Sequence, residues 1–439
     1  MDTLDTVLAE VEELFYIPIS RINSIASRFR DAMADGLAGK QSSLKMLPSF
    51  IGSPTGQEQG RVVAVDFGGT NVRVMLIELT TYGQARVIER RSFPLKDKLN
   101  KYDYTAATSS GVELFKFIAG KIAEIVPQEG IFPLGHTFSF PCRQYSVNKA
   151  VLISWTKEIK TEGVEGRDVG ELLQAGLDSN GLSHVKSHAV INDTTGTLLA
   201  AAYSDAAADI GAILGTGHNS CYLEPYHPAN RQAMIINLES GNFDEVVQTK
   251  YDVLLDAASE KPGAQRLEKM VSGQYLGEIV RLIVKELVAQ GHIQAGLERL
   301  AVPYSLPTND ISTLLADSSK ELNGVAAIVT SNWGIAEITL SERKAIQKVA
   351  GYVAARSARL AAATWAGVLL KIDPNLERQH TIAVDGSLFE KMPGYSRYLT
   401  QAIADIYGDK TSRVSVKLSK DGSGIGAAIA AAMAYRNSL

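Results

Sequence analysis

The sequence predicts an α/β protein with two domains, or with one domain split by insertions. Its 439 residues exceed what one ordinary hydrophobic core accommodates. Four glycine-rich turns recur along the chain, around Gly68, Gly215, Gly386 and Gly422, and the first three follow short apolar runs of strand character. Stretches with apolar residues at helical spacing separate these turns. A chain of this length and pattern can bury a deep cleft.

The composition is typical of soluble globular proteins, with 45% hydrophobic and 21% charged residues. A formal net charge of -4, without a long Lys/Arg run, argues against nucleic acid and membrane surfaces as partners. Residues 1–13 carry five acids and no basic stretch, so we expect neither export nor a membrane anchor. Cys142 and Cys221 show no disulfide or zinc spacing, which fits a reducing cytoplasm.

The N-terminal region is predicted to be helical. Apolar residues recur at helical spacing from Val7 to Leu37, which indicates an amphipathic helix or a helix pair that ends near Gly36 and Gly39. We expect it to dock on the main body. Residues 52–60 are rich in Gly, Pro, Ser and Thr and are predicted to be a connector.

The sequence predicts two glycine-rich hairpins. The first spans residues 61–79, with a Phe-Gly-Gly-Thr-Asn turn at 67–71 between two apolar strands. The second spans residues 210–223, with a Gly-Thr-Gly-His-Asn turn at 215–219. The repeated layout suggests an internal duplication of the chain.

The remaining elements complete an α/β pattern. A third strand with a glycine turn covers residues 382–387, and Asp421–Gly424 opens an alanine-rich helix that runs to the C-terminus. The clearest other elements are helices over 112–126, 265–287 and 346–371 and a strand over 234–238.

The two hairpin turns suit phosphate groups. Glycine and small hydroxyl residues can aim consecutive backbone N–H groups at one point, and two such turns can clamp one triphosphate. Neither turn matches GxxxxGK[ST] or leads into a helix, so P-loop and dinucleotide-binding interpretations fail. Asp66, at the end of its strand, is a candidate ligand for Mg²⁺, directly or through water. Taken singly, each turn also fits a plain hairpin.

Three polar clusters in apolar surroundings suit a sugar. They are Thr137–Pro141, Trp155–Lys157 and Val190–Thr194. Sugar hydroxyl groups need directional partners, because an unpaired buried polar group costs about 1–3 kcal/mol. Asp193 closes an apolar run, where it can accept the proton of an attacking hydroxyl group. The alternative is that Asp193 is a helix N-cap.

In this order, the motifs resemble the hexokinases of the actin-like ATPase superfamily. The resemblance runs from about Leu37 to the C-terminus. Besides the Gly-Gly-Thr-Asn turn, it rests on residues 43–50, 134–142, 192–194 and 215–217, on Glu239, and on Lys261-Pro262-Gly263 leading to Glu268-Lys269.

The resemblance implies the site residues. Around the hexose it places Ser139, Thr156, Lys157, Asn192, Asp193, Asn219, Glu239 and Glu268. Asp193 would be the catalytic base and Lys157 would neutralise charge near the transferred phosphoryl group. For Mg·ATP it implies Asp66, Gly68, Gly69, Thr70, Asn71, Arg73, Gly215, Thr216 and Gly217 at the phosphates, with Gly386, Ser387, Ser423 and Gly424 further out. Asp66 would hold Mg²⁺.

It also implies a two-lobed actin-like ATPase, or ribonuclease H-like, fold with a central cleft. The small lobe would comprise residues 61–192 and 424–439, and the large lobe residues 1–60 and 193–423. The implied function is transfer of the γ-phosphoryl group of ATP to the 6-hydroxyl of glucose, or of fructose or mannose, by a cytoplasmic monomer or homodimer with one catalytic unit.

Several positions depart from the family pattern. Ser240-Gly241-Asn242 stands where Trp-Gly usually follows the glutamate, His136 where an aromatic residue is usual, Ser387 for Thr, and Lys420 for an acid. These departures bear on affinity and sugar preference. Two alternatives therefore stay open: a non-catalytic sugar sensor of the same fold, and a kinase for another acceptor such as an amino sugar. Trp155 and Phe138 are expected to be packing residues, and both cysteines to be buried and inert.

Overall fold

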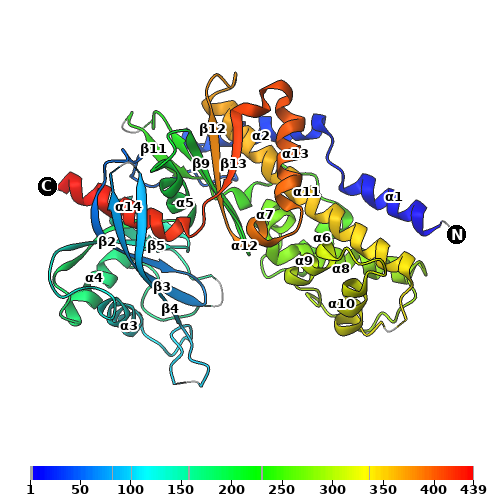
Figure 1. Ribbon diagram of the computed structural model, residues 1–439, viewed down its shortest axis with the longest axis horizontal. Coiled ribbons are helices and arrows are strands. Elements are labelled where there is room, and N and C mark those ends of the chain that lie inside the picture. Colours follow the sequence, from blue (N-terminus) through cyan, green and yellow to red (C-terminus); the bar gives the residue numbers. More distant parts are fainter. Residues whose placement is uncertain are drawn as a thin grey trace.

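The computed structural model describes residues 3–81, 83–99, 101–156, 159–228, 231–335 and 337–438. Two mixed sheets organise the chain (Figure 1). The five-stranded sheet has the order β4-β3-β2-β5-β8 and the larger one β1-β11-β10-β9-β12-β13. The strands of the first are β2 (Gly60–Phe67), β3 (Asn71–Thr80), β4 (Gln84–Pro94), β5 (Phe132–Phe138) and β8 (Val185–Ile191). Those of the second are β1 (Leu47–Pro48), β9 (Ala208–Leu214), β10 (His218–Glu224), β11 (Met234–Asn237), β12 (His380–Asp385) and β13 (Val414–Leu418).

The two sheets repeat one topology. In each, three consecutive antiparallel strands, β2-β3-β4 or β9-β10-β11, are extended on the side of the first strand by two parallel ones, β5 and β8 or β12 and β13. Both predicted hairpins are therefore present at equivalent places. The shared topology supports the internal duplication that the turns suggested.

Helices surround both sheets. Beside the five-stranded sheet lie α3 (Gly111–Ala123), α4 (Val169–Ser179) and a small hairpin of β6 (Cys142–Ser146) and β7 (Lys149–Leu152). Beside the larger sheet lie α1 (Leu4–Phe15), α2 (Ile19–Leu37), α6 (Lys250–Ala258), α7 (Arg266–Val271), α8 (Gly273–Ala289), α9 (Thr308–Ala316), α10 (Asn323–Trp333), α11 (Leu340–Ile372), α12 (Ser387–Lys391) and α13 (Tyr395–Tyr407).

Two helices cross between the sheets. Helix α5 (Asp193–Ala202) follows β8 of the five-stranded sheet but packs on β9 and β10 of the larger one. Helix α14 (Gly422–Ser438) follows β13 of the larger sheet but packs on β2, β5 and β8. The helices also pack on each other, and their apolar residues form a third core together with strand residues from both sheets. Figure 1 shows α14 running from the middle of the molecule across the five-stranded sheet.

The N-terminal helix pair is confirmed. Pro18 separates the helices because it lacks the backbone N–H that a continuous helix needs. Phe15 and Phe29 are buried in the larger core, and both helices pack on α11, so the predicted docking role holds.

One predicted helix is wrong. The stretch 265–287 is broken at Ser272, whose backbone is extended (φ -79, ψ 152), into α7 and α8. The break lets the first N–H groups of α8 donate to the glycine turn between β9 and β10: Gly273 N to Gly215 O at 2.8 Å and Gln274 N to Thr216 O at 3.1 Å. A continuous helix would have used these donors internally. The other two helices are present with shifted ends.

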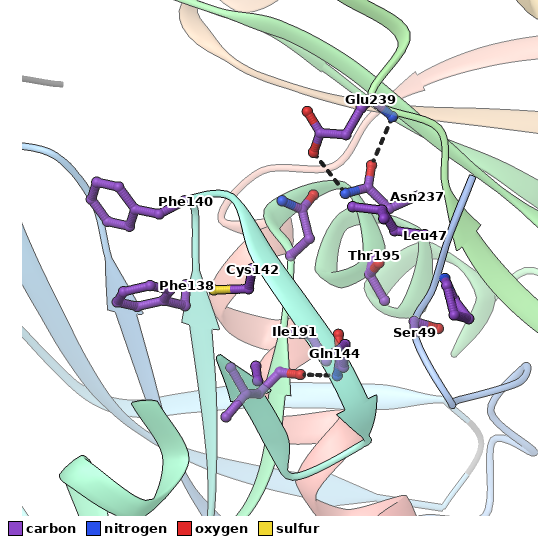
Figure 2. A pocket seen from close by; sticks show the side chains of 14 residues that line it. Leu47, Ser49, Phe138, Phe140, Cys142, Gln144, Ile191, Thr195, Asn237 and Glu239 are labelled. Atoms are coloured by element: carbon purple, nitrogen blue, oxygen red, sulfur yellow. Dashed lines mark hydrogen bonds between the residues drawn. The ribbon is translucent and has the colours of Figure 1, made fainter. Parts of the chain in front are cut away.

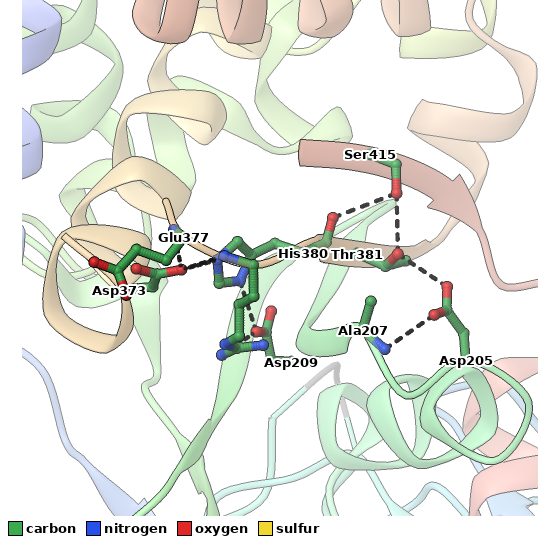
Figure 3. A network of polar contacts seen from close by, with 9 residues as sticks. Asp205, Ala207, Asp209, Asp373, Glu377, His380, Thr381 and Ser415 are labelled. Atoms are coloured by element: carbon green, nitrogen blue, oxygen red, sulfur yellow. Dashed lines mark hydrogen bonds and ion pairs between the residues drawn. The ribbon is translucent and has the colours of Figure 1, made fainter. Parts of the chain in front are cut away.

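A polar network lies at the N-terminal ends of the parallel strands β9 and β12, away from the glycine turns that follow them (Figure 3). The two ring nitrogens of His380 lie 2.8 Å from Asp209 Oδ2 and 3.0 Å from Asp373 Oδ2. Arg378 also pairs with Asp209, at 2.7 Å. The network ties the C-terminal end of α11 to two central strands.

Replacing Gly426 by Ala tests the helix crossing. A Cβ there would overlap the backbone of Gly196 in α5, so we expect the free energy of unfolding to fall by about 1–3 kcal/mol, although Ala is the better helix former. The matched control is Gly120→Ala in α3, where the nearest atom would be 3.8 Å away and a slight gain is expected. Urea unfolding measures the free energy of unfolding of both variants. Equal changes in the two variants would contradict the close approach of α5 and α14.

Candidate active site

The end of β8 and the start of α5 carry the predicted base. Asn192, not Asp193, is the N-cap: its Oδ1 accepts hydrogen bonds from Thr194 N (3.0 Å) and Thr194 Oγ1 (2.8 Å). The N-cap alternative for Asp193 is therefore wrong. Asp193 is the first helical residue, half-buried, with Oδ1 2.9 Å from Thr194 N. A carboxylate at this place is stabilised by the helix dipole.

The larger sheet contributes an amide–carboxylate cluster. Asn219 Nδ2 donates to Glu239 Oε1 (3.3 Å) and to Asn237 Oδ1 (2.9 Å), and Asn237 Nδ2 donates to Glu239 Oε1 (2.9 Å). Figure 2 shows Asn237 beneath Glu239, bonded to both its carboxylate and its backbone N–H. Sequence reasoning missed Asn237. Its signal was a polar residue at the end of an apolar strand, two places before Glu239.

Glu268 joins this cluster through the second glycine turn. Its Oε2 accepts a hydrogen bond from His218 N at 3.0 Å, and its Cβ packs against Gly241. Glu239 has a left-handed backbone (φ 52), which is unfavourable for a residue other than glycine. The residues that follow it form a tight 3₁₀ turn, and Ser240 N donates to Asn219 Oδ1 at 3.1 Å.

Asn192, Asn237 and Glu239 line one pocket with apolar residues at the end of β5 and the start of β6. Phe138, Phe140 and Cys142 line the same pocket, and Figure 2 shows the two phenylalanine rings on the side away from Asn237 and Glu239. The structure thus brings residues from both sheets to one place. It is this meeting of an apolar wall with convergent amides and carboxylates that suits a small polar ligand.

The other predicted sugar residues lie on neighbouring loops. Ser139 directly follows β5, and Thr156 lies after β7; both are half-buried. Trp155 packs edge-to-face on Phe140 with ring centroids 4.9 Å apart and also contacts Phe138, so the packing role expected for Trp155 and Phe138 is confirmed. Lys157 lies outside the described residues.

The cysteines differ from expectation in one respect. Cys221 is buried and its Sγ donates to Thr194 O, but Cys142 is only half-buried and lines the pocket. Burial raises the pKa of each thiol to about 12. Both thiols therefore stay protonated and unreactive near neutral pH.

The first glycine turn and α14 meet at Asp66. Asp66 is buried, and its Oδ2 lies 2.7 Å from Arg73 Nη2 and 2.9 Å from Ser423 Oγ. Within the turn, Gly68 N donates to Asn71 O (3.1 Å), and Asn71 Nδ2 donates to Thr70 Oγ1 (2.9 Å). The N-terminus of α14, a favourable place for an anion, thus lies beside the predicted phosphate turn.

The second and third glycine turns are also neighbours. The Gly386 backbone is so close to Leu214 and Gly215 that a Cβ at Gly386 would clash with both. Thr216 is exposed, and Gly217 lies beside Glu268. The predicted nucleotide turns of the larger sheet therefore form one surface. Of the predicted pair in α14, Gly424 is buried and packs against Met75.

Asp385 is a further acid that sequence reasoning did not assign. Burial raises its pKa to about 6, against hydrogen bonds from the backbone N–H groups of Gly386 and Ser423. Ser423 therefore contacts two carboxylates, Asp66 through its hydroxyl and Asp385 through its backbone. The signal in the sequence was the position of Asp385 at the end of a strand, equivalent to that of Asp66.

Asp66 and Asp385 do not form an all-protein metal site, but they fit an Mg²⁺ ion that arrives bound to a nucleotide. Among the residues that the structure describes, no group of three or more His, Cys, Asp or Glu side chains could hold a metal ion. Mg²⁺ takes one or two carboxylates together with water and substrate phosphates. Asp66 and Asp385, which both contact Ser423, are the carboxylates that would hold such an ion.

The fold and this geometry define the class of protein. Two sheets of equal topology, with glycine turns facing a shared site, make the chain a two-lobed kinase of actin-like fold. A solved structure described as a hexokinase from Schistosoma mansoni complexed with glucose aligns with a TM-score of 0.84 and 34% identity, over 98% of this chain and 99% of that one.

Sequence comparisons agree. Two family models, each described as hexokinase, match residues 7–203 and 209–433. The chain is 37% identical to Hexokinase-7 of Oryza sativa subsp. japonica, over 98% of its own length and 96% of the relative's. It is 34% identical to Hexokinase-1 of Schizosaccharomyces pombe, over 98% and 91%. The chain belongs to the hexokinase family. The match also begins earlier than Leu37 and includes most of the helix pair.

Replacing His136 by Phe tests the aromatic wall. His136 is fully buried among Phe67, Phe115 and Phe138, and burial lowers its pKa from 6.5 to about 3. The unfolded chain binds this proton below about pH 6.5 and the folded protein does not, so acid lowers stability by up to about 1.4 kcal/mol per pH unit. We expect His136→Phe to remove this loss.

Urea unfolding at pH 7 and pH 5 measures the effect. The half-buried His292 supplies the control variant, His292→Phe. His218, which burial also leaves with a lowered pKa of about 4, is retained in both proteins and contributes equally. An unchanged acid sensitivity in His136→Phe would contradict the prediction.

Proposed function

We propose that this chain transfers the γ-phosphoryl group of Mg·ATP to the 6-hydroxyl group of a hexose. One observation carries the proposal: Asn192, at the start of α5 and directly before Asp193, shares a pocket with Glu239, while Ser423 at the start of α14 contacts both Asp66 and Asp385 beside two phosphate-type turns. A polar sugar pocket and an anion site thus lie at the first turns of two helices in mutual contact.

Asp193 is the proposed general base. It accepts the proton of the 6-hydroxyl group as that oxygen forms its bond to the γ-phosphorus, and the bond from the γ-phosphorus to the bridging oxygen of ADP breaks. The hydrogen bond from Thr194 N to one carboxylate oxygen fixes the direction of the other. Lys157 is proposed to neutralise charge at the phosphoryl group.

The hexose is proposed to bind between the two sheets. Its hydroxyl groups would pair with amide and carboxylate groups that the fold already orients, and its apolar face would lie on the wall around Phe138. The proposed ligands are Ser139, Thr156, Lys157, Asn192, Asp193, Asn219, Glu239 and Glu268. Asn237 holds Glu239 in place for this role.

ATP is proposed to lie along the glycine turns and the start of α14. The predicted contacts at Asp66, Arg73 and the turns 68–71, 215–217, 386–387 and 423–424 stand as proposals. Mg²⁺, brought with the nucleotide, would neutralise phosphate charge, with Asp66 and Asp385 as the carboxylates within the site.

The division into lobes is likewise a proposal. Residues 61–192 and 424–439 would form the small lobe, because α14 packs on the five-stranded sheet, and residues 1–60 and 193–423 the large lobe. Two free cysteines support a cytoplasmic location. In the part of the chain that the structure describes, no helix has the length and apolarity needed to span a bilayer. A monomer or homodimer without nucleic acid or membrane partners stays a prediction.

Sugar-dependent ADP release from Mg·ATP tests the reaction. We expect the purified protein to release ADP with glucose, and with fructose or mannose at rates that rank the acceptors, and to release almost none without sugar. Glucosamine in the same panel tests the amino-sugar alternative raised by Ser240. Thermal stabilisation by glucose without turnover would instead indicate the sugar sensor, which the reported hexokinase relatives do not favour.

Asp193→Ala tests the base. We expect kcat to fall by about 10²–10⁴-fold, because the attacking hydroxyl group loses its proton acceptor, while stabilisation by Mg·ATP is retained. The exposed Asp178, at the end of α4, supplies the control variant Asp178→Ala, for which kcat should be unchanged. Near-normal turnover in Asp193→Ala would reject this residue as the base.

A further inference from the structure

The turn into α14 is held by two arginines of the five-stranded sheet. Asp421 Oδ2 accepts a hydrogen bond from Arg90 Nη1 at 2.6 Å, and its Oδ1 accepts one from Arg73 Nη1 at 3.5 Å. Asp421 has a left-handed backbone (φ 54), which is unfavourable for a side chain with a Cβ. The ion pairs therefore hold a strained residue immediately before the helix that carries Ser423.

Arg73, Met75 and Arg90 share one face of the β3–β4 ribbon. Residues two apart on a strand point to the same side, and Met75 is the register partner of Arg90. A Cβ at Gly424 would clash with the Met75 side chain, so the first turn of α14 lies directly on this face. Two guanidinium groups thus flank the N-terminus of a 17-residue helix.

Arg73 connects this turn to the phosphate end of the site. One of its terminal nitrogens faces Asp421, and the other lies 2.7 Å from Asp66 Oδ2. Because a guanidinium group is planar and rigid, a carboxylate at one edge fixes the direction of the other edge. Arg90 pairs with Asp421, and Asp421 pairs with Arg73, so a path of ion pairs leads from Arg90 through Asp421 and Arg73 to Asp66.

We propose that Arg90 is a positioning residue for the nucleotide. By holding Asp421 it keeps Arg73 directed at Asp66 and keeps Ser423 in place beside the phosphate turns. The inference rests on the proposed kinase function and adds a residue outside the predicted site. The group that it serves is the phosphate chain of Mg·ATP, not the hexose.

Steady-state kinetics of Arg90→Ala test the proposal. We expect the KM for ATP to rise about two- to fivefold, the range that loss of a partly exposed ion pair gives, with the KM for hexose unchanged. In Arg90→Lys, which keeps the positive charge, the KM for ATP should return close to that of the unmodified protein. Asp421→Ala should resemble Arg90→Ala, and the double variant should add little to either, because both act through one chain of contacts.

Arg86→Ala is the matched control. Arg86 lies on the same strand and pairs with Glu78 across the ribbon, away from α14, so its removal should leave the KM for ATP unchanged. Melting temperatures of Arg90→Ala and Arg86→Ala should agree, which separates positioning from general stability. Arg90→Ala kinetics equal to the control, or an equal rise in both KM values, would overturn the inference.

The two proposals fail separately. Absence of sugar-dependent ADP release by the unmodified protein would contradict the kinase function. The role of Arg90 would then be decided by the thermal shift that Mg·ATP produces, which should be smaller in Arg90→Ala than in Arg86→Ala. Equal shifts would contradict the positioning role whatever the reaction.

Discussion

The contact between α5 and α14 is the constraint on which the site depends. Each helix leaves one sheet and packs on the other, and glycines at the crossing bring the backbones together. Because no side chain lies between Gly196 and Gly426, the spacing is set by main-chain atoms that cannot change rotamer. The first turns of the same helices carry Asp193 and Ser423. The crossing therefore fixes the separation of Asp193 from Ser423.

The charges around the crossing follow from the same arrangement. Both helix N-termini favour anions, and each is met by a carboxylate: Asp193 within α5, and Asp66 beside α14. Asp385 brings a second carboxylate to α14 from the other sheet, as the duplication requires. Acids gathered in this way repel one another unless cations join them, which gives Arg73 a structural role beside Asp66.

Much of the fold could be predicted because its signals are local. Apolar runs interrupted by glycine turns marked both hairpins, and the spacing of apolar residues marked the N-terminal helix or helix pair. The break at Ser272 was missed because its cause is tertiary: the loop at Gly215 and Thr216 takes the first donors of α8. Periodicity alone continues across such a break, since the residues on both sides face the same core.

Site residues that belong to sequence motifs could be predicted. Residues whose role depends on contacts with distant parts of the chain could not. Asn192, Asn219 and Glu239 belong to recognisable motifs, whereas Asn237 acquires its meaning only from the side chains that it touches. Asp385 can be recognised as the counterpart of Asp66 only once the duplicated sheet topology is known. Arg90 lies among several arginines of one edge strand, and its sequence neighbours give no sign that it, rather than Arg86, reaches α14.

The departure after Glu239 shows why the reaction type can survive local change. Ser240 is buried in a tight turn, and its backbone N–H, not its side chain, reaches Asn219. Glu239 is directed by its left-handed backbone and by Asn237, neither of which needs a large residue at position 240. A substitution there changes the packing beneath the sugar pocket while the carboxylate keeps its hydrogen bonds. If the proposed function holds, sugar preference can vary at this loop independently of Asp193, which is held separately at the start of α5.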